Sequence, residues 1–306
     1  INFATALMKS FLRHLSLLDI IHVLFCLALV VLHFSHILTS RYKISALLYY
    51  ALIFGFIGAM VRYREKGERN RLHSVMMLIY PMITMFLLFG SLSFSTNFFN
   101  PKPYDQAMAA LDLKWFGTYP TVWMSQWITP ARTEIMYILY LFYFPMPVIP
   151  LVWLFLKKDY RGLEEMLFTF FLCYYGAFIM YFNVPVLGPR YFLKELHSVP
   201  LNGYFLTDPI RNLINFMEPT KQDCFPSMHT AITFMAVFVS YYVNRKLFVW
   251  FSILSLGILL SLIYCRYHYV VDILAGAVWA CICYFIGKRI FAKAHPYFSY
   301  QFVREI

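Results

Sequence analysis

Three short segments of this chain contain the polar residues best suited to chemistry. They are "GPR" at 188–190, "FPSMH" at 225–229 and "YCRYHYVVD" at 264–272. In the last segment, His268 and Asp272 are four residues apart, a spacing that places both side chains on one face of a helix. A carboxylate that keeps one imidazole nitrogen protonated leaves the other nitrogen free as a nucleophile or base. The spacing therefore predicts an oriented histidine, and an ion pair on a helix surface is the simpler alternative.

The "FPSMH" segment is typical of a helix start that binds an anion. Pro226 suits the first helical turn, and the free N–H groups that follow carry the positive end of the helix dipole. Ser227 adds a hydroxyl donor, and His229 can give a proton to a leaving oxygen. A capped helix start with an incidental histidine is the alternative.

Two arginines are candidate phosphate ligands. Arg190 presents a planar cationic fork suited to phosphate oxygens, although an arginine at this depth can also simply anchor the membrane boundary. Arg266 precedes His268 by two residues, so it joins the site only if the helix breaks there.

Together, these residues favour in-line attack on phosphorus through a phosphohistidine. Without a carboxylate cluster suited to Mg²⁺, we expect neither a metal nor a cofactor. A haem or zinc site built from His229 and His268 would leave Ser227 and Asp272 without roles.

The elements that must position these residues are membrane helices. Of the 306 residues, 61% are hydrophobic and 13% are charged, which predicts an all-α polytopic membrane helix bundle. We expect one domain over 1–306, with accessory helices in 1–71 and a catalytic core in 72–290. About eight stretches are candidate spans, at 17–38, 44–61, 72–92, 133–156, 163–182, 226–243, 247–265 and 269–287.

The distribution of charge predicts the orientation of these spans. If the chain alternates sides, sixteen of the 26 Lys and Arg residues lie with the two termini and nine lie opposite, while Arg266 lies at a helix end. This positive-inside pattern predicts cytoplasmic termini and places all three segments on the extracytoplasmic or lumenal face. The net charge of +11 therefore needs no nucleic acid partner.

Two long connections, 93–132 and 183–225, lie on the same predicted face as the three segments. The first contains an expected interfacial helix near 103–127, which either guides substrate or simply connects two spans. We expect Tyr104, Met108, Leu111 and Trp115 on one face of this helix, which lies on the membrane, with Asp105, Asp112 and Lys114 away from that face. Of the six cysteines, only Cys224 and Cys265 are candidates for a disulfide, and the sequence does not decide whether they form one.

The three segments resemble motifs of the type-2 phosphatidic acid phosphatase superfamily, in particular its inositol phosphorylceramide synthase branch. "FPSMH" is similar to the Phe-Pro-Ser-Leu-His element of that branch, and "HYVVDILAG" to its His-Tyr-x-x-Asp segment. The likeness covers 184–287, and "YDQAMAALD…FGTYP" adds a weaker one. It implies a six-helix catalytic core with His268 as nucleophile, Asp272 as its partner and His229 as proton donor.

The sequence departs from the wider superfamily at its cations. Asn183 stands where the first motif has Lys, Tyr191 follows Arg190 in place of Pro, and Leu262 stands where the third motif has Arg. Arg266 is a candidate replacement. Because the head-group transferase branch also departs from the full pattern, the loss favours that branch.

The expected function is that of a membrane lipid phosphotransferase, which moves a phosphorylated head group such as phosphoinositol between lipids through a phosphohistidine. Water as acceptor would instead make the protein a lipid phosphatase, the first alternative. A non-catalytic membrane transporter or scaffold is the second. The expected partners are lipid substrates and the bilayer, and the sequence indicates no particular partner subunit.

Overall fold

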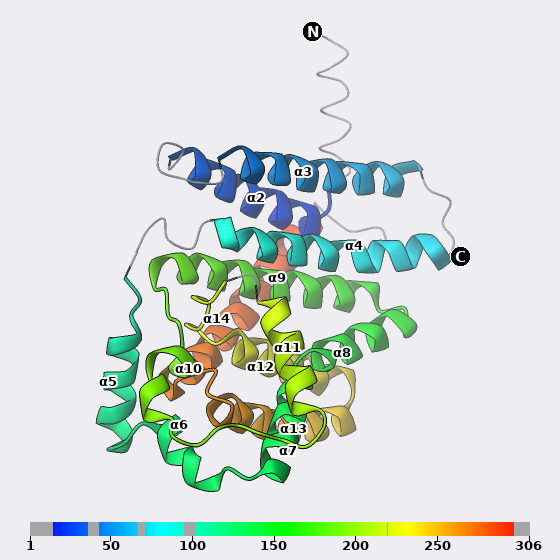
Figure 1. The fold of residues 1–306 in the computed structure, drawn as a ribbon. Coiled ribbons are helices and arrows are strands. Elements are labelled where there is room, and N and C mark those ends of the chain that lie inside the picture. Colours follow the sequence, from blue (N-terminus) through cyan, green and yellow to red (C-terminus); the bar gives the residue numbers. More distant parts are fainter. Residues whose placement is uncertain (1–14, 36–42, 67–70, 95–101, 219, 297–306) are drawn as a thin grey trace. The chain divides into compact units, whose positions relative to one another are not determined.

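The computed structural model describes residues 15–35, 43–66, 71–94, 102–218 and 220–296 (Figure 1). These residues form helices joined by turns and loops, and the described part of the chain contains no β-strand. The predicted all-α fold is confirmed.

Seven helical stretches in the described residues are long and apolar enough to cross a bilayer, so the chain is a multi-pass membrane protein. They comprise α2 (Leu17–Ser35), α3 (Lys43–Lys66), α4 (Arg71–Gly90), the α7–α8 pair (Pro130–Leu141 and Pro145–Leu156), α9 (Tyr160–Asn183), α13 (Arg245–Tyr264) and α14 (Val270–Ala294). The eighth expected stretch forms α12 (Met228–Val243), an apolar helix of only 16 residues.

The chain forms two compact units, and α9 and α14 each contribute to both. The first unit contains residues 1–95, 160–172 and 286–306. In it, α2 packs on α3 and α4, and the short helix η1 (Ser91–Phe94) follows α4 (Figure 1). Asp19 on α2 forms a buried ion pair with Arg64 on α3, with an Oδ2–Nη2 distance of 2.5 Å.

The second unit, residues 96–159 and 173–285, contains all three polar segments. In this unit α12 packs on α8 and α13, while α13 and α11 (Thr207–Met217) both pack on α7. Its shorter helices are α5 (Asp105–Phe116), α6 (Pro120–Trp123), η2 (Met124–Trp127), α10 (Pro189–Phe192) and η3 (Lys194–Leu196). That both units form a single domain stays a prediction.

Local sequence explains where α12 begins and ends. Ser227 caps the start by accepting a hydrogen bond from the N–H of Thr230 at 3.3 Å. At the other end, the Asn244 side chain accepts from the N–H groups of Lys246 and Leu247 and thereby begins α13. The two caps fix the length of α12 and hold its N-terminal turn, with His229, next to the loop that follows α13.

Candidate active site

His268 lies in the loop between α13 and α14, and Asp272 lies in the first turn of α14. The expectation that one helix carries both residues is therefore wrong, because α13 ends at Tyr264 and α14 starts at Val270. The loop still brings His268 Nδ1 to 3.6 Å from Asp272 Oδ2. The carbonyl of Leu262 holds the loop in place by accepting from the N–H groups of Tyr267 and His268.

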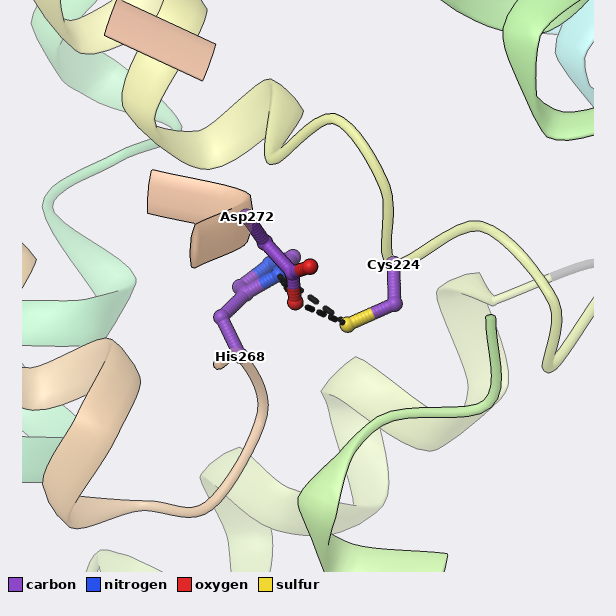
Figure 2. A group of neighbouring side chains, drawn as sticks. All are labelled: Cys224, His268 and Asp272. Carbon is purple, nitrogen blue, oxygen red and sulfur yellow. Dashed lines mark hydrogen bonds and ion pairs between the residues drawn. The ribbon is translucent and has the colours of Figure 1, made fainter. Parts of the chain in front are cut away.

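A thiol contacts both members of this pair, as Figure 2 shows. Cys224 Sγ is 3.2 Å from His268 Nδ1 and donates to Asp272 Oδ2 at 3.0 Å. Burial raises the pKa of this thiol, so the sulfur keeps its proton to donate. All six cysteines are free, so the disulfide between Cys224 and Cys265 does not form.

The second ring nitrogen of His268 faces His229. His268 Nε2 is 3.1 Å from His229 Nδ1, which joins the loop before α14 to the first turn of α12. Burial lowers the pKa of His268 to about 3, and the positive charge of Arg190 acts in the same direction. His268 is therefore neutral at pH 7, and with its hydrogen on Nδ1 it keeps a lone pair on Nε2.

Tyr140, on α7, completes this chain of contacts. Its hydroxyl is 2.6 Å from His229 Nε2, and its ring packs on those of His229 and Tyr267. A hydroxyl that donates to Nε2 leaves the hydrogen of His229 on Nδ1, directed at His268. Tyr140 thus orients His229. The sequence showed no sign of this role, because nothing distinguishes Tyr140 from the other tyrosines among the 24 in the chain.

Replacing Tyr140 by Phe is expected to lower kcat roughly 10-fold, a fraction of the 10²- to 10⁴-fold contribution of a positioned proton donor. Tyr143→Phe is the matched control, because its ring also packs on His229 while its hydroxyl contacts Tyr174 at 3.1 Å. Steady-state kinetics of both variants test this. Equal effects from the two substitutions would show that ring packing matters and the Tyr140 hydroxyl does not.

Arg190 lies in α10, beside the histidines. Its guanidinium stacks on the rings of Tyr191 and Tyr267, with Cζ-to-centroid distances of 4.6 and 4.4 Å. It also forms an ion pair with Glu218 and donates to Asn215. A phosphate that binds Arg190 would therefore share this cation with Glu218.

Gly188 explains how the "GPR" segment approaches so closely. Its φ of +93° lies in the left-handed region that glycine tolerates. A Cβ at this position would come within 2.8 Å of the Tyr267 carbonyl oxygen and 3.2 Å of Cys224 Sγ. The absent side chain lets this segment lie directly against both neighbouring loops.

Two of the predicted phosphate ligands, Ser227 and Arg266, have other partners in the structure. The Ser227 hydroxyl is buried and accepts from Thr230, so it serves α12 as a cap. Helix α13 ends before Arg266, whose φ is +65°, so the condition for Arg266 to join the site is met. However, its guanidinium donates to the Val199 carbonyl, while its own carbonyl oxygen accepts from the Arg190 N–H at 2.9 Å. Arg266 thus positions Arg190 through the backbone.

A model of the PAP2 superfamily matches residues 114–286, more than half of the chain. The chain belongs to the PAP2 superfamily. Members of this superfamily are typically phosphatases or phosphotransferases. The match contains Arg190, His229, His268 and Asp272. Comparisons with curated proteins and with solved structures found no significant match.

Just before the segment shared with the PAP2 superfamily, α5 carries two carboxylates that hold the loops of the site. Asp105 accepts from the N–H groups of Leu187 and Gly188, each at 2.8 Å, and from the Tyr269 hydroxyl. Asp112 accepts from the N–H groups of Val270 and Val271 at the start of α14.

The face of α5 that carries these two carboxylates is therefore turned towards the loops of the site. Asp105 and Asp112 are fully buried, whereas Tyr104 and Trp115 are 40% and 50% exposed. Among the four residues of the expected apolar face, Met108 is buried, and it packs with Val186, Cys224 and Tyr269. The inner face is polar because it satisfies backbone N–H groups of the loops, which burial would otherwise leave without partners.

Replacing Asp112 by Ala is expected to lower the free energy of unfolding by about 1–2 kcal/mol, the usual cost of losing a helix cap. We also expect kcat to fall up to roughly 100-fold, because a shift of the first turn of α14 displaces Asp272. Thermal unfolding in detergent and kinetics measure the two effects.

Asp208→Ala is the control for Asp112→Ala, since Asp208 is an exposed carboxylate at the start of α11. It should change stability by less than about 0.5 kcal/mol. If the two variants behave alike, Asp112 does not hold α14.

Proposed function

We propose that this protein is a membrane lipid phosphotransferase that moves a phosphorylated head group between lipids through a phosphohistidine on His268. Membership of the PAP2 superfamily supports phosphatase or phosphotransferase chemistry. The observation that carries the proposal is the 3.1 Å contact between His268 Nε2 and His229 Nδ1, with Asp272 and Cys224 on the opposite side of the His268 ring. It gives one histidine the environment of a nucleophile and the other that of a proton donor.

In the first half-reaction, the donor phosphate enters between the two histidines and replaces their mutual hydrogen bond. The lone pair of His268 Nε2 forms a bond to phosphorus, while the bond from phosphorus to the donor's lipid oxygen breaks. With the anionic phosphate bound, His229 is protonated on both ring nitrogens; it gives its Nδ1 proton to that oxygen and becomes neutral, so the lipid alcohol leaves neutral. The Asp272 carboxylate and the Cys224 sulfur, both next to the Nδ1–H of His268, stabilise the positive charge that develops on the ring.

In the second half-reaction, the acceptor hydroxyl loses its proton to His229 as its oxygen bonds to phosphorus. The N–P bond then breaks, which restores neutral His268 and a protonated His229 Nδ1. Arg190, Ser227 and the N–H groups at the start of α12 are the proposed phosphate ligands, with Arg266 positioned behind Arg190.

Burial of the site supports a lipid acceptor over water. His268 and Asp272 are 3% and 0% exposed, and a closed site limits hydrolysis of a reactive intermediate. The resemblance of "FPSMH" and "HYVVDILAG" to inositol phosphorylceramide synthases makes phosphoinositol the first head group to test, with ceramide as acceptor.

Mass spectrometry of lipids after incubation with phosphatidylinositol and ceramide in mixed micelles tests the proposal, with His268→Ala as comparison. A new inositol phospholipid that the variant does not form supports transfer. Release of inositol phosphate or inorganic phosphate without a lipid product would instead establish hydrolysis. If neither appears, also with phosphatidic acid as donor, the proposal is wrong.

We further propose that the site lies on the extracytoplasmic or lumenal face, on the basis of the charge bias of the loops. A cysteine substituted for the exposed Lys221, in a background without other reactive thiols, should be labelled by an impermeant maleimide only from that face of sealed vesicles. Labelling from the cytoplasmic face alone would reverse the orientation.

A further inference from the structure

The side chains of Cys224, His268 and Asp272 form a closed triangle at the proposed nucleophile (Figure 2). Cys224 Sγ lies 3.2 Å from His268 Nδ1 and 3.0 Å from Asp272 Oδ2, and Nδ1 lies 3.6 Å from Oδ2. They come from three places in the chain: the loop before α12, the loop before α14 and the first turn of α14. In the described residues, no other group of His, Cys, Asp or Glu side chains has this arrangement.

These separations fit the ligands of one tetrahedral metal ion. Zinc bonds of about 2.3 Å to sulfur and 2.0–2.2 Å to nitrogen or oxygen place neighbouring ligand atoms roughly 3.4–3.6 Å apart. The observed separations differ from these values by no more than about 0.6 Å, which small side-chain rotations supply.

The second carboxylate oxygen of Asp272 is an independent sign that the triangle can bind a cation. Asp272 is fully buried, yet its Oδ1 has no hydrogen-bond partner. A buried carboxylate oxygen without a donor is costly, and a cation beside it would remove that cost.

We propose that Cys224, His268 and Asp272 form an inhibitory site for a soft divalent cation of the Zn²⁺ class. Thiolate and imidazole ligands prefer such ions, whereas Mg²⁺ and Ca²⁺ require sets of oxygen ligands. The inhibitory effect rests on the proposed function, while the binding does not. The site does not assist the reaction, which uses His268 without a metal.

The inhibition follows from the two nitrogens of one ring. When the cation binds, the Cys224 thiol releases its proton and a metal–sulfur bond forms. His268 must offer the lone pair of Nδ1, so the hydrogen of the neutral ring moves to Nε2. Nε2 then has no lone pair with which to attack phosphorus, and Asp272 is occupied by the metal.

Cobalt(II), which occupies zinc sites and reports thiolate ligation by a charge-transfer absorption band, tests the binding directly. Purified full-length protein is titrated with Co²⁺, and Zn²⁺ then displaces it. We expect one equivalent and a thiolate band in the wild type. Cys224→Ala should abolish the band and weaken Zn²⁺ binding by more than about 100-fold, the upper range for loss of an outer hydrogen bond to a ligand.

Cys265→Ala is the matched control, because Cys265 is an equally buried free thiol outside the triangle. It should keep the band and the affinity of the wild type. Cys224→Ser serves if the alanine variant is not monodisperse. Absence of the band in the wild type, or its persistence in both Cys224 variants, would overturn the proposed site.

Activity separates failure of this site from failure of the proposed function. Zn²⁺ should inhibit the wild type and Cys265→Ala reversibly, with recovery on chelation, while Mg²⁺ should not. Inhibition of Cys224→Ala, expressed relative to its own activity without zinc, should need at least roughly 100-fold more Zn²⁺. A protein that shows the cobalt band but forms no lipid product would retain the metal site and refute the proposed chemistry. Equal sensitivity of all three proteins would refute the inhibitory role.

Discussion

Replacing His268 by Gln is expected to abolish transfer, with kcat lowered by about 10⁴-fold or more. The reaction then has no nucleophile, and losing the nucleophile of an acyl-transferring triad costs this much or more. Gln keeps much of the size and polarity of the ring, so the packing against Cys224 and His229 changes little. The kinetic loss should be accompanied by loss of the covalent intermediate. Mass spectrometry of acid-sensitive, alkali-stable adducts should find the head group on His268 of the wild type and nowhere on the variant.

His197→Gln is the control for this experiment. His197 lies in the same unit but is not part of the triangle, and its Nε2 contacts the Thr121 hydroxyl at 3.1 Å. That variant should retain both turnover and the adduct. If His268→Gln keeps its activity, or if the adduct forms on another residue, His268 is not the nucleophile.

The sequence predicted the helices well because lipid imposes a strong pattern. A span needs about 20 apolar residues, and each long helix of the structure covers one predicted stretch. The same pattern explains why the three polar segments were predicted to meet, since spans that alternate in direction bring "GPR", "FPSMH" and the loop after α13 to one face of the membrane. Hydropathy does not count residues at a helix end, however. It started the last span at 269, one residue before α14 starts at Val270. The four-residue spacing placed His268 and Asp272 on one helix, whereas Arg266 adopts a positive φ and His268 lies in the loop before α14.

The sequence did not show what the polar face of α5 contacts, for a different physical reason. The usual pattern places apolar residues inside because water lies outside. Here the neighbours of α5 are loops with free N–H groups, and Asp105 and Asp112 satisfy them from the buried side. The aromatic side chains Trp115 and Phe116 are left on the exposed side, which suits an interface with lipid. The presence of two acidic residues seven apart in a helix between membrane spans was the one signal available.

The site's cations show what spacing alone cannot decide. Leu262 and Asn183 stand where the wider superfamily has cations. In the structure, both residues take part in hydrogen bonds to backbone carbonyls. The Leu262 carbonyl holds the His268 loop, and the Asn183 side chain donates to the Ile179 carbonyl at 2.7 Å. Arg190 is thus the cation whose role is closest to that of the missing ones. Its ion pair with Glu218 reduces the positive charge that it offers a phosphate. The contact between Arg190 and Glu218 does not follow from sequence, because 28 positions in the chain separate the two residues.

Replacing His229 by Gln is expected to separate proton donation from nucleophilic attack. With a lipid donor, kcat should fall about 10²- to 10⁴-fold, because the alkoxide must then leave without a proton. A donor that carries the same head-group phosphate on p-nitrophenol needs little protonation, since nitrophenolate is a stable leaving group. For that donor, we expect the variant to lose less than about 10-fold. The comparison uses one protein and two donors, so a change in folding or in the amount of active protein cancels.

The ratio of the two losses identifies the role of His229. A ratio of roughly 10-fold or more would place its Nδ1 proton on the leaving oxygen, as its 3.1 Å contact with His268 Nε2 suggests. Equal losses with both donors would mean that His229 only supports the His268 ring, and the proton donor would have to be sought elsewhere. Tyr140→Phe should show the same dependence on the leaving group in weaker form, because its hydroxyl contacts His229 Nε2 and acts only through that ring. Agreement between the two variants would establish that Tyr140 orients the ring whose proton goes to the leaving oxygen.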